Sequence, residues 1–182
     1  MELMEAIMRR RSIRSYRSDE VSEELLNKIL EAARWAPSWA NTQCWEFIIV
    51  KDKQTKEKLA ETLPPPNPAR GALSTAPIVI VACGRKGKAG FYKGTVTTVK
   101  GDWFMFDVAL AMQNLTLAAH SLGLGTVHVG LFDSQKAEEI LGVPDEVEVV
   151  EMTPLGFPDK ESKAPPRKEL KDFVFYESYG KK

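Results

Sequence analysis

Residues 103–122 read WFMFDVALAMQNLTLAAHSL, and this stretch predicts the longest helix of the chain. Apart from Asp107 and His120 it carries no ionisable side chain. A helix that is apolar on all sides must be buried on all sides. In a chain of 182 residues, such burial favours a subunit interface over a solitary core helix. We therefore expect a homodimer, with Gly123 and Gly125 ending the helix.

Apolar runs on both sides of this stretch predict strands. Three candidates lie at residues 45–50, 77–82 and 146–154. The first is a nearly continuous apolar run, which is typical of a central strand. A fourth candidate lies at residues 173–176, in a terminal arm that could pack on the other subunit.

Helical spacing and capping residues predict shorter helices between these strands. We expect them at residues 2–9, 22–36, 55–63, 67–73 and 133–141. Ser22 is the expected N-cap of the second, and either Asp133 or Ser134 caps the last. Residues 84–101 show no clear period, and a loop of this length inside a compact domain is usually functional or mobile.

Composition limits the class of protein. A length of 182 residues suits one domain spanning residues 1–182, with no internal repeat or linker. Twenty-five Lys and Arg balance 25 Asp and Glu, so the formal net charge is zero, and we expect no nucleic-acid partner. No apolar run is long enough to span a membrane and no signal peptide precedes Met1, so we expect a cytoplasmic protein.

Motifs for catalysis by a protein nucleophile or a bound metal are poorly represented. Cys44 and Cys83 form no CxxC pair and have apolar neighbours, which favours buried structural thiols. His120 and His128 are separated by a glycine-containing break, which is not a metal-ligand spacing on one helix face. There is also no dinucleotide-binding glycine motif, P-loop or Ser-centred elbow. If the protein is an enzyme, we expect a cofactor to carry the chemistry.

Residues 9–16, RRRSIRSY, form the strongest candidate binding segment. Four arginines fall within six positions, with a serine among them. Guanidinium forks suit phosphate and carboxylate oxygens and the polar edge of a planar heterocycle. The alternative is a solvated charge run at a helix end, where cations favour the helix dipole. The segment alone modestly favours this alternative. Because the chain as a whole is neutral, however, the positive charge is confined to this cluster, which suits a small anion better than a polyanion.

Four segments resemble the nitroreductase family of FMN-dependent oxidoreductases. They are RRSIRSY at residues 10–16, AARWAPS at 32–38 with Asn41, Gln43 and Trp45 after it, GDW at 101–103 leading into DVALAMQNL and GLGT, and GFP at 156–158 followed by Pro166-Arg167. In this order they cover essentially the whole chain. The resemblance implies an α+β fold with a mostly antiparallel central sheet surrounded by helices. It also implies an intertwined homodimer with two FMN molecules at the interface.

The resemblance assigns roles to individual residues. Arg10 and Ser12 match groups on the FMN phosphate and ribityl chain, Arg14 matches a cation near the pyrimidine edge, and Arg167 matches a second phosphate-binding cation. Arg9 can be simply solvated. The full implied cofactor-binding set is Arg10, Arg11, Ser12, Arg14, Pro37, Ser38, Trp39, Asn41, Asn67, Gly130, Leu131 and Arg167.

Within this set, Pro37, Ser38 and Asn41 match a loop that reaches FMN from the partner subunit. Trp39 either narrows the pocket, stacks on the acceptor or packs in the interface. Asn67 matches a pyrimidine-binding asparagine by loose spacing. The backbone of Gly130 and Leu131 matches the segment that faces flavin N5 and O4.

The implied mechanism is ping-pong and needs no side-chain acid or base. NADH or NADPH reduces the flavin, and a small-molecule acceptor such as a nitroaromatic or quinone then takes the electrons. The alternatives are a flavin-binding sensor or carrier without turnover, and a reductive dehalogenase or flavin-processing relative on the same fold. We expect His128 to be a structural histidine with its hydrogen bonds satisfied, in preference to a proton donor. Residues 84–101 occupy the position of the family's variable lid.

Overall fold

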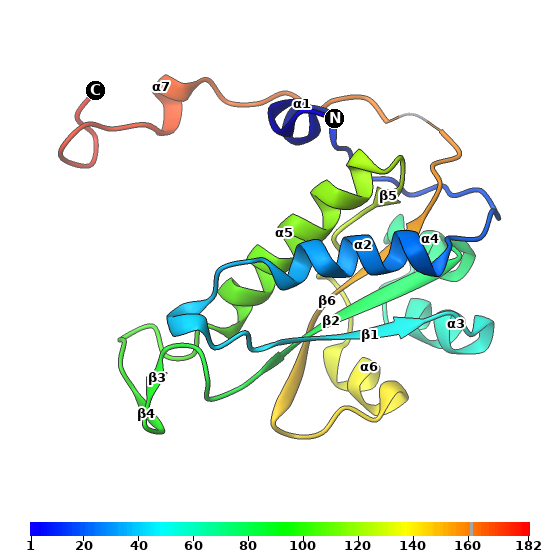
Figure 1. Ribbon diagram of the computed structural model, residues 1–182, viewed down its shortest axis with the longest axis horizontal. Helices are drawn as coiled ribbons and strands as arrows, with labels where there is room; N and C mark the ends of the chain where they lie inside the picture. The colour runs from blue at the N-terminus through cyan, green and yellow to red at the C-terminus, as the bar shows by residue number, and fades with distance from the viewer. Residues whose placement is uncertain (161) are drawn as a thin grey trace.

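A four-stranded antiparallel sheet lies at the centre of the structure, a computed structural model that describes residues 1–160 and 162–182 (Figure 1). Its strands stand in the order β1 (Trp45–Val50), β2 (Ile78–Arg85), β6 (Val147–Gly156) and β5 (Gly125–Thr126). A separate hairpin is formed by β3 (Phe91–Tyr92) and β4 (Thr95–Val96). An antiparallel central sheet with helices confirms the predicted α+β class.

Helices cover both faces of this sheet (Figure 1). The core on one face is closed by α2 (Glu23–Arg34) and α5 (Phe104–Ser121). The core on the other face is closed by α3 (Lys53–Glu61), α4 (Ala69–Thr75) and α6 (Ser134–Leu141). The remaining helical segments are α1 (Leu3–Arg9), the 3₁₀ turn η1 (Trp39–Asn41) and α7 (Leu170–Phe173).

Side-chain caps account for several predicted helix starts. Ser22 Oγ accepts a hydrogen bond from the Leu25 backbone N–H, as predicted. Asp133 fills the same role at α6, where it accepts from the Lys136 backbone N–H, so Asp133 and not Ser134 is the cap. Both side chains satisfy a backbone donor that the first helical turn leaves unpaired.

The central position predicted for residues 45–50 is wrong. Among the described residues, β1 pairs only with β2, so it is an edge strand, and β2 is the strand buried on both faces. The apolar run of β1 has a different cause. Phe47 and Ile49 pack into the core with α2 and α5, while Ile48 and Val50 pack into the opposite core. Helices cover both faces of the edge strand, so its sequence resembles that of a central strand.

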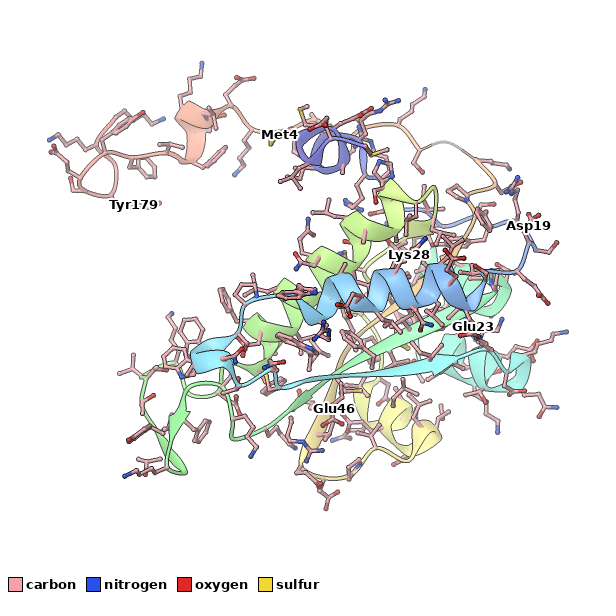
Figure 2. All side chains as sticks on the ribbon, in the orientation of Figure 1. Met4, Asp19, Glu23, Lys28, Glu46 and Tyr179 are labelled. Atoms are coloured by element: carbon pink, nitrogen blue, oxygen red, sulfur yellow. The ribbon has the colours of Figure 1, made fainter. Side chains whose placement is uncertain are left out.

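The predicted strand at residues 173–176 is also wrong. Phe173 ends the short helix α7, which begins at a capping box between Glu169 and Asp172. No described strand lies beside the following residues. Figures 1 and 2 show this C-terminal arm extending away from the sheet, with Tyr179 near its end. Without a neighbouring strand to accept its hydrogen bonds, the segment cannot form a ladder.

The segment without a clear period, residues 84–101, is more regular than expected. β2 continues to Arg85, and β3 and β4 then form a hairpin around Lys93 and Gly94. Both turn residues have positive φ, 48° and 79°, which suits the tight two-residue hairpin turns. A lysine at the first turn position is a weak hairpin signal, which explains why the sequence did not reveal the turn.

Candidate functional site

The arginine-bearing segment lies as an extended rib beside the edge of the sheet. Ser12 forms a parallel bridge with Thr126, and Tyr16 forms an antiparallel bridge with Pro158. The Ile13 backbone N–H donates to the Thr126 carbonyl at 2.9 Å. This approach requires glycine at position 125, since a Cβ there would lie 2.8 Å from Ile13 Cγ1. The fold therefore fixes the backbone from which the arginines project.

Two pockets open along this rib. The first, called the arginine pocket, has a volume of about 510 Å³ and is bordered by Arg9, Arg10, Arg11, Ile13 and the end of α5. The second, called the proline pocket, has a volume of about 380 Å³ and contains Pro64, Pro66 and Pro68. Arg14 borders the second pocket, so the rib presents cations to both.

Arg10 is the most constrained cation of the arginine pocket. Its Nη1 atom is buried and has no hydrogen-bond partner among the described residues. Burial lowers the pKa of Arg10, and the charges of Arg11 and Arg167 lower it further. The structure thus brings Arg167, from the far end of the chain, into the electrostatic reach of Arg10. A guanidinium with a buried, unpaired donor and two cationic neighbours is suited to bind an anion.

The other arginines are partly engaged by the protein itself. Arg11 Nη1 donates to the carbonyls of Met8 and Arg10 at 2.7 and 2.8 Å, which closes the C-terminal end of α1. Arg9 forms an exposed ion pair with Glu5 at 2.7 Å, as befits a solvated side chain. Arg167 Nη1 contacts the backbone carbonyls of two preceding prolines at 3.2 and 3.3 Å. Neither Ser12 nor Arg167 is among the residues that line the two pockets.

The proline pocket brings together residues that are distant in sequence. Asn67 Nδ2 donates to the Leu131 carbonyl at 3.4 Å, and Asn67 Oδ1 accepts from the Ala69 backbone N–H at 2.9 Å. Asn67 therefore joins the start of α4 to the Gly130–Leu131 segment. With Arg14 on the same pocket, four of the expected flavin-ring residues meet at one place.

Gly130 leaves open space in the proline pocket. A Cβ at this position would meet no atom within 4 Å, and its φ does not require glycine. Gly130→Ala should therefore fold normally but place a methyl group where a planar ligand would approach. We expect an unchanged melting temperature and FMN affinity reduced by about tenfold, which corresponds to 1.4 kcal/mol. Calorimetric titration and thermal unfolding measure the two effects.

Gly71→Ala provides the matched control for this substitution. Gly71 lies in α4 and also has no neighbour within 4 Å of an added Cβ. Alanine favours a helix over glycine by about 0.5–1 kcal/mol, so this variant should be slightly stabilised and bind FMN normally. Equal FMN affinity in both variants would contradict the placement of a ligand against Gly130.

His128 lines the proline pocket and is held by a carboxylate. Its Nδ1 lies 2.8 Å from Glu151 Oε2, and the Glu151 side chain is only 14% exposed. This contact fixes the ring and satisfies one of its nitrogens. The arrangement is the satisfied histidine that the sequence favoured.

The loop that carries Pro37, Ser38, Trp39 and Asn41 is held by a residue whose role the sequence did not reveal. Asp107, in the first turn of α5, is fully buried. Its carboxylate accepts hydrogen bonds from the Trp39 backbone N–H at 3.0 and 3.1 Å and from the Thr42 hydroxyl at 3.2 Å. The sequence feature that could have revealed this role is the presence of one acidic residue in an otherwise uncharged helix turn.

This carboxylate maintains an unusual backbone. Ala40, Asn41 and Gln43 have φ values of 43°, 56° and 48°, a region that residues other than glycine seldom adopt. Such strain persists where the surrounding structure over-determines it and is common at functional sites. The Trp39 ring also packs on Trp103, with ring centroids 5.4 Å apart. The loop is therefore a shaped element and not a passive connection.

Both cysteines are buried and free, as predicted. Burial, followed by the charge of Asp107, raises the pKa of Cys44 to about 12. Burial likewise raises the pKa of Cys83 to about 12. Neither thiol is a nucleophile at neutral pH, because the reactive species is the thiolate. The described residues also contain no cluster of His, Cys, Asp and Glu that could hold a metal ion.

Two groups of the expected cofactor residues lie at opposite ends of α5. The loop with Pro37, Ser38 and Asn41 lies at its first turn, next to Asp107. The arginine pocket includes His120 and Leu124 at its other end. The 18 residues of α5 correspond to a length of about 27 Å. One protomer therefore does not bring both groups to one place.

Comparison with known proteins identifies the family of this chain. Residues 7–64 and 65–157 match the model of the nitroreductase family. The chain belongs to the nitroreductase family. It is thus an oxidoreductase of the nitroreductase type, and the family resemblance found in the sequence is confirmed.

Relatives and solved structures of this nitroreductase-family chain cover nearly all of it. A relative from Methanothermobacter thermautotrophicus is 36% identical over 162 residues, which are 87% of this chain and 78% of the relative. The FMN reductase [NAD(P)H] of Bacillus subtilis is 31% identical and matches 91% of this chain and 70% of its own length. The structure of an FMN-dependent nitroreductase from Clostridium difficile R20291 superposes with a TM-score of 0.80 at 30% identity, covering 95% of this chain and 98% of that one.

Proposed function

We propose that this protein is an FMN-dependent oxidoreductase that takes electrons from NADH or NADPH and passes them to a small acceptor such as a nitroaromatic or a quinone. The observation that carries the proposal is the buried Nη1 of Arg10, which lies among other cations and has no partner in the described part of the chain. Family membership supports it, as do relatives named FMN reductase [NAD(P)H] and FMN-dependent nitroreductase.

The residues present fit FMN. A phosphate monoester carries close to two negative charges, which suits the arginine pocket. Arg10 and Arg167 would hold this phosphate, Arg11 would add positive charge from the helix end, and Ser12 would meet the ribityl chain. The open face of Gly130 in the proline pocket would receive the ring.

Chain residues would then set the properties of the ring. When bound, FMN supplies hydride and electron transfer between the nicotinamide and the acceptor. Arg14, on the proline pocket, would stabilise negative charge at the pyrimidine edge, because a fixed cation costs no reorganisation during the reaction. Asn67 and the backbone of Gly130 and Leu131 would fix the ring through polar contacts at its edge. No side-chain acid or base is required by this arrangement.

We further propose that the chain acts as a single domain in a homodimer, with each flavin site shared by two protomers. The loop at residues 37–41 and the arginine pocket lie at opposite ends of α5, so a partner copy must supply the loop. Exposed apolar side chains support this. Met105 and Phe106 on α5 are 59% and 54% exposed, although both are large and apolar. Leu3, Met4 and Met8 on α1 and the aromatic C-terminal arm are similarly uncovered.

Met105→Glu should dissociate this dimer. A buried unpaired carboxylate costs several kcal/mol, so we expect monomers in sedimentation experiments and loss of bound flavin. Gln135→Glu, on the exposed surface of α6, adds the same charge and should leave the dimer intact. A dimeric, flavin-loaded Met105→Glu variant would contradict the interface assignment.

Anaerobic reduction tests the proposed function. The purified protein should bind FMN, and the flavin absorbance should bleach when NADH or NADPH is added. A nitroaromatic or quinone should then restore it over many cycles. Bound flavin that neither nicotinamide bleaches would instead indicate a flavin carrier, and failure to bind FMN would overturn the proposal altogether.

A further inference from the structure

His120 is a polar group of the arginine pocket to which no role has been given. It lies in the last turn of α5, and its side chain lines the pocket beside Arg10 and Arg11. Its Nε2 atom is buried and has no hydrogen-bond partner among the described residues. Arg10 Nη1 is in the same condition in the same pocket. Two buried nitrogen atoms without partners in one cavity indicate a shared ligand that accepts hydrogen bonds.

The charges around His120 determine what that ligand can be. Burial lowers the pKa of His120, and the charges of Arg10, Arg11 and Arg9 lower it further, while Glu5 opposes them. Met1, which bears the α-amino group, and Asp159 and Lys160 also line the pocket, and Asp159 accepts a hydrogen bond from the Ser15 hydroxyl at 3.0 Å. Cations thus dominate around the imidazole, and they disfavour its protonation as long as no anion is present.

We propose that His120 is a further phosphate-binding residue, and that its imidazole takes up a proton from solvent when a phosphate dianion enters the arginine pocket. This rests on the proposed function, since the phosphate in question is that of FMN. The dianion offsets the repulsion from the three arginines, so the imidazolium becomes stable. His120 Nε2 then donates a charge-assisted hydrogen bond to a phosphate oxygen.

Proton uptake makes binding depend on pH. Because the complex holds one more proton than the free protein, FMN affinity should fall as pH rises above neutrality, by up to tenfold per pH unit. Below about pH 6 the phosphate itself becomes a monoanion, which limits the gain at acid pH. Riboflavin lacks the phosphate, so its affinity should not show this dependence.

Calorimetric titration of the full-length apoprotein measures this uptake. Heats of FMN binding are recorded at pH 7.5 in two phosphate-free buffers with different ionisation enthalpies, and riboflavin is titrated in the same way. We expect a substantial fraction of a proton to be taken up with FMN and none with riboflavin. His120→Gln should abolish the uptake and weaken FMN binding about tenfold. His128→Gln, which alters the other histidine, should retain the phosphate-dependent part.

The outcomes separate the inference from the function on which it rests. The proposed role of His120 is overturned if FMN binds without proton uptake in the wild type. It is also overturned if the His120→Gln variant takes up as much of a proton as the wild type. In both cases the proposal of an FMN-binding protein remains supported. If neither FMN nor riboflavin binds, the proposed function fails as well. His120→Asn and thermal unfolding of both variants show whether a lost effect reflects misfolding.

Stability provides an independent readout in the absence of flavin. The folded apoprotein has a lowered pKa for His120 relative to the ordinary value of 6.5, so the unfolded state binds the proton more readily. With respect to His120, the free energy of unfolding is therefore highest above pH 6.5, where the imidazole is neutral in both states. It decreases as the pH falls below 6.5. We expect the melting temperature to decline over this window and inorganic phosphate to reduce the decline. His120→Gln should remove the phosphate-sensitive component, and an identical decline in this variant would contradict the proposal.

Discussion

Replacing Arg10 by glutamine is expected to weaken FMN binding by about 10- to 150-fold. The Nη1 atom of half-buried Arg10 is itself buried and has no hydrogen-bond partner among the described residues, and a hydrogen bond to a charged group contributes about 1.5–3 kcal/mol. Glutamine retains a donor but loses the charge and the planar fork. The dissociation constant measured by fluorescence titration of the apoprotein reports the effect.

The same substitution should leave the apoprotein as stable as before or more stable. The charges of Arg11 and Arg167 disfavour the cation at position 10 in the absence of a ligand, and glutamine removes that repulsion. Arg17→Gln is the matched control, because Arg17 pairs with Asp19 in an exposed position and lines neither pocket. It should change neither quantity appreciably. Equal FMN affinity in the Arg10→Gln and Arg17→Gln variants would refute the phosphate assignment.

Replacing Asp107 by alanine is expected to destabilise the protein by about 3 kcal/mol. The Trp39 backbone N–H and the Thr42 hydroxyl would lose a buried acceptor, and each unsatisfied buried group costs about 1–3 kcal/mol. For a domain of this size the melting temperature should fall by about 6–12 °C. The loop bearing Ser38 and Asn41 should loosen at the same time, so flavin retention should also drop.

Two further variants sharpen this expectation. Asp107→Asn keeps one acceptor oxygen for the Trp39 N–H, so it should lose less stability than the alanine variant. Asp145→Ala removes an exposed carboxylate and should shift stability by no more than about 0.5 kcal/mol. If Asp107→Ala unfolds at the wild-type temperature, the carboxylate does not hold the loop.

The sequence predicted those features of the fold that depend on residues adjacent in the chain. The cap of α2 at Ser22 and the extent of α5 follow from local capping and composition. The position of a strand within the sheet does not follow from local sequence. Residues 45–50 and 78–85 are both apolar, and only the long-range pairing that leaves β1 at the edge distinguishes them.

In the candidate site, too, the sequence predicted the residue types but not the long-range contacts that arrange them. The family resemblance identified Arg10, Arg14 and Arg167 as cations for one ligand. The placement of Arg10 and Arg14 on two different pockets, however, depends on the bridge between Ser12 and Thr126. Asp107 contacts Trp39 across 68 positions of sequence, and no periodicity reports a contact of that kind. His120 likewise acquires a chemical environment only when the end of α5 meets the residues after α1.

The sharing of each flavin site between two protomers is tested most directly by sedimentation velocity with detection at the flavin absorbance. Protein reconstituted with FMN is diluted through the range in which the dimer dissociates. All bound flavin should travel with the dimer, at one FMN per chain, and should be released as monomers form. Flavin that travels with the monomer at undiminished affinity would contradict the shared site.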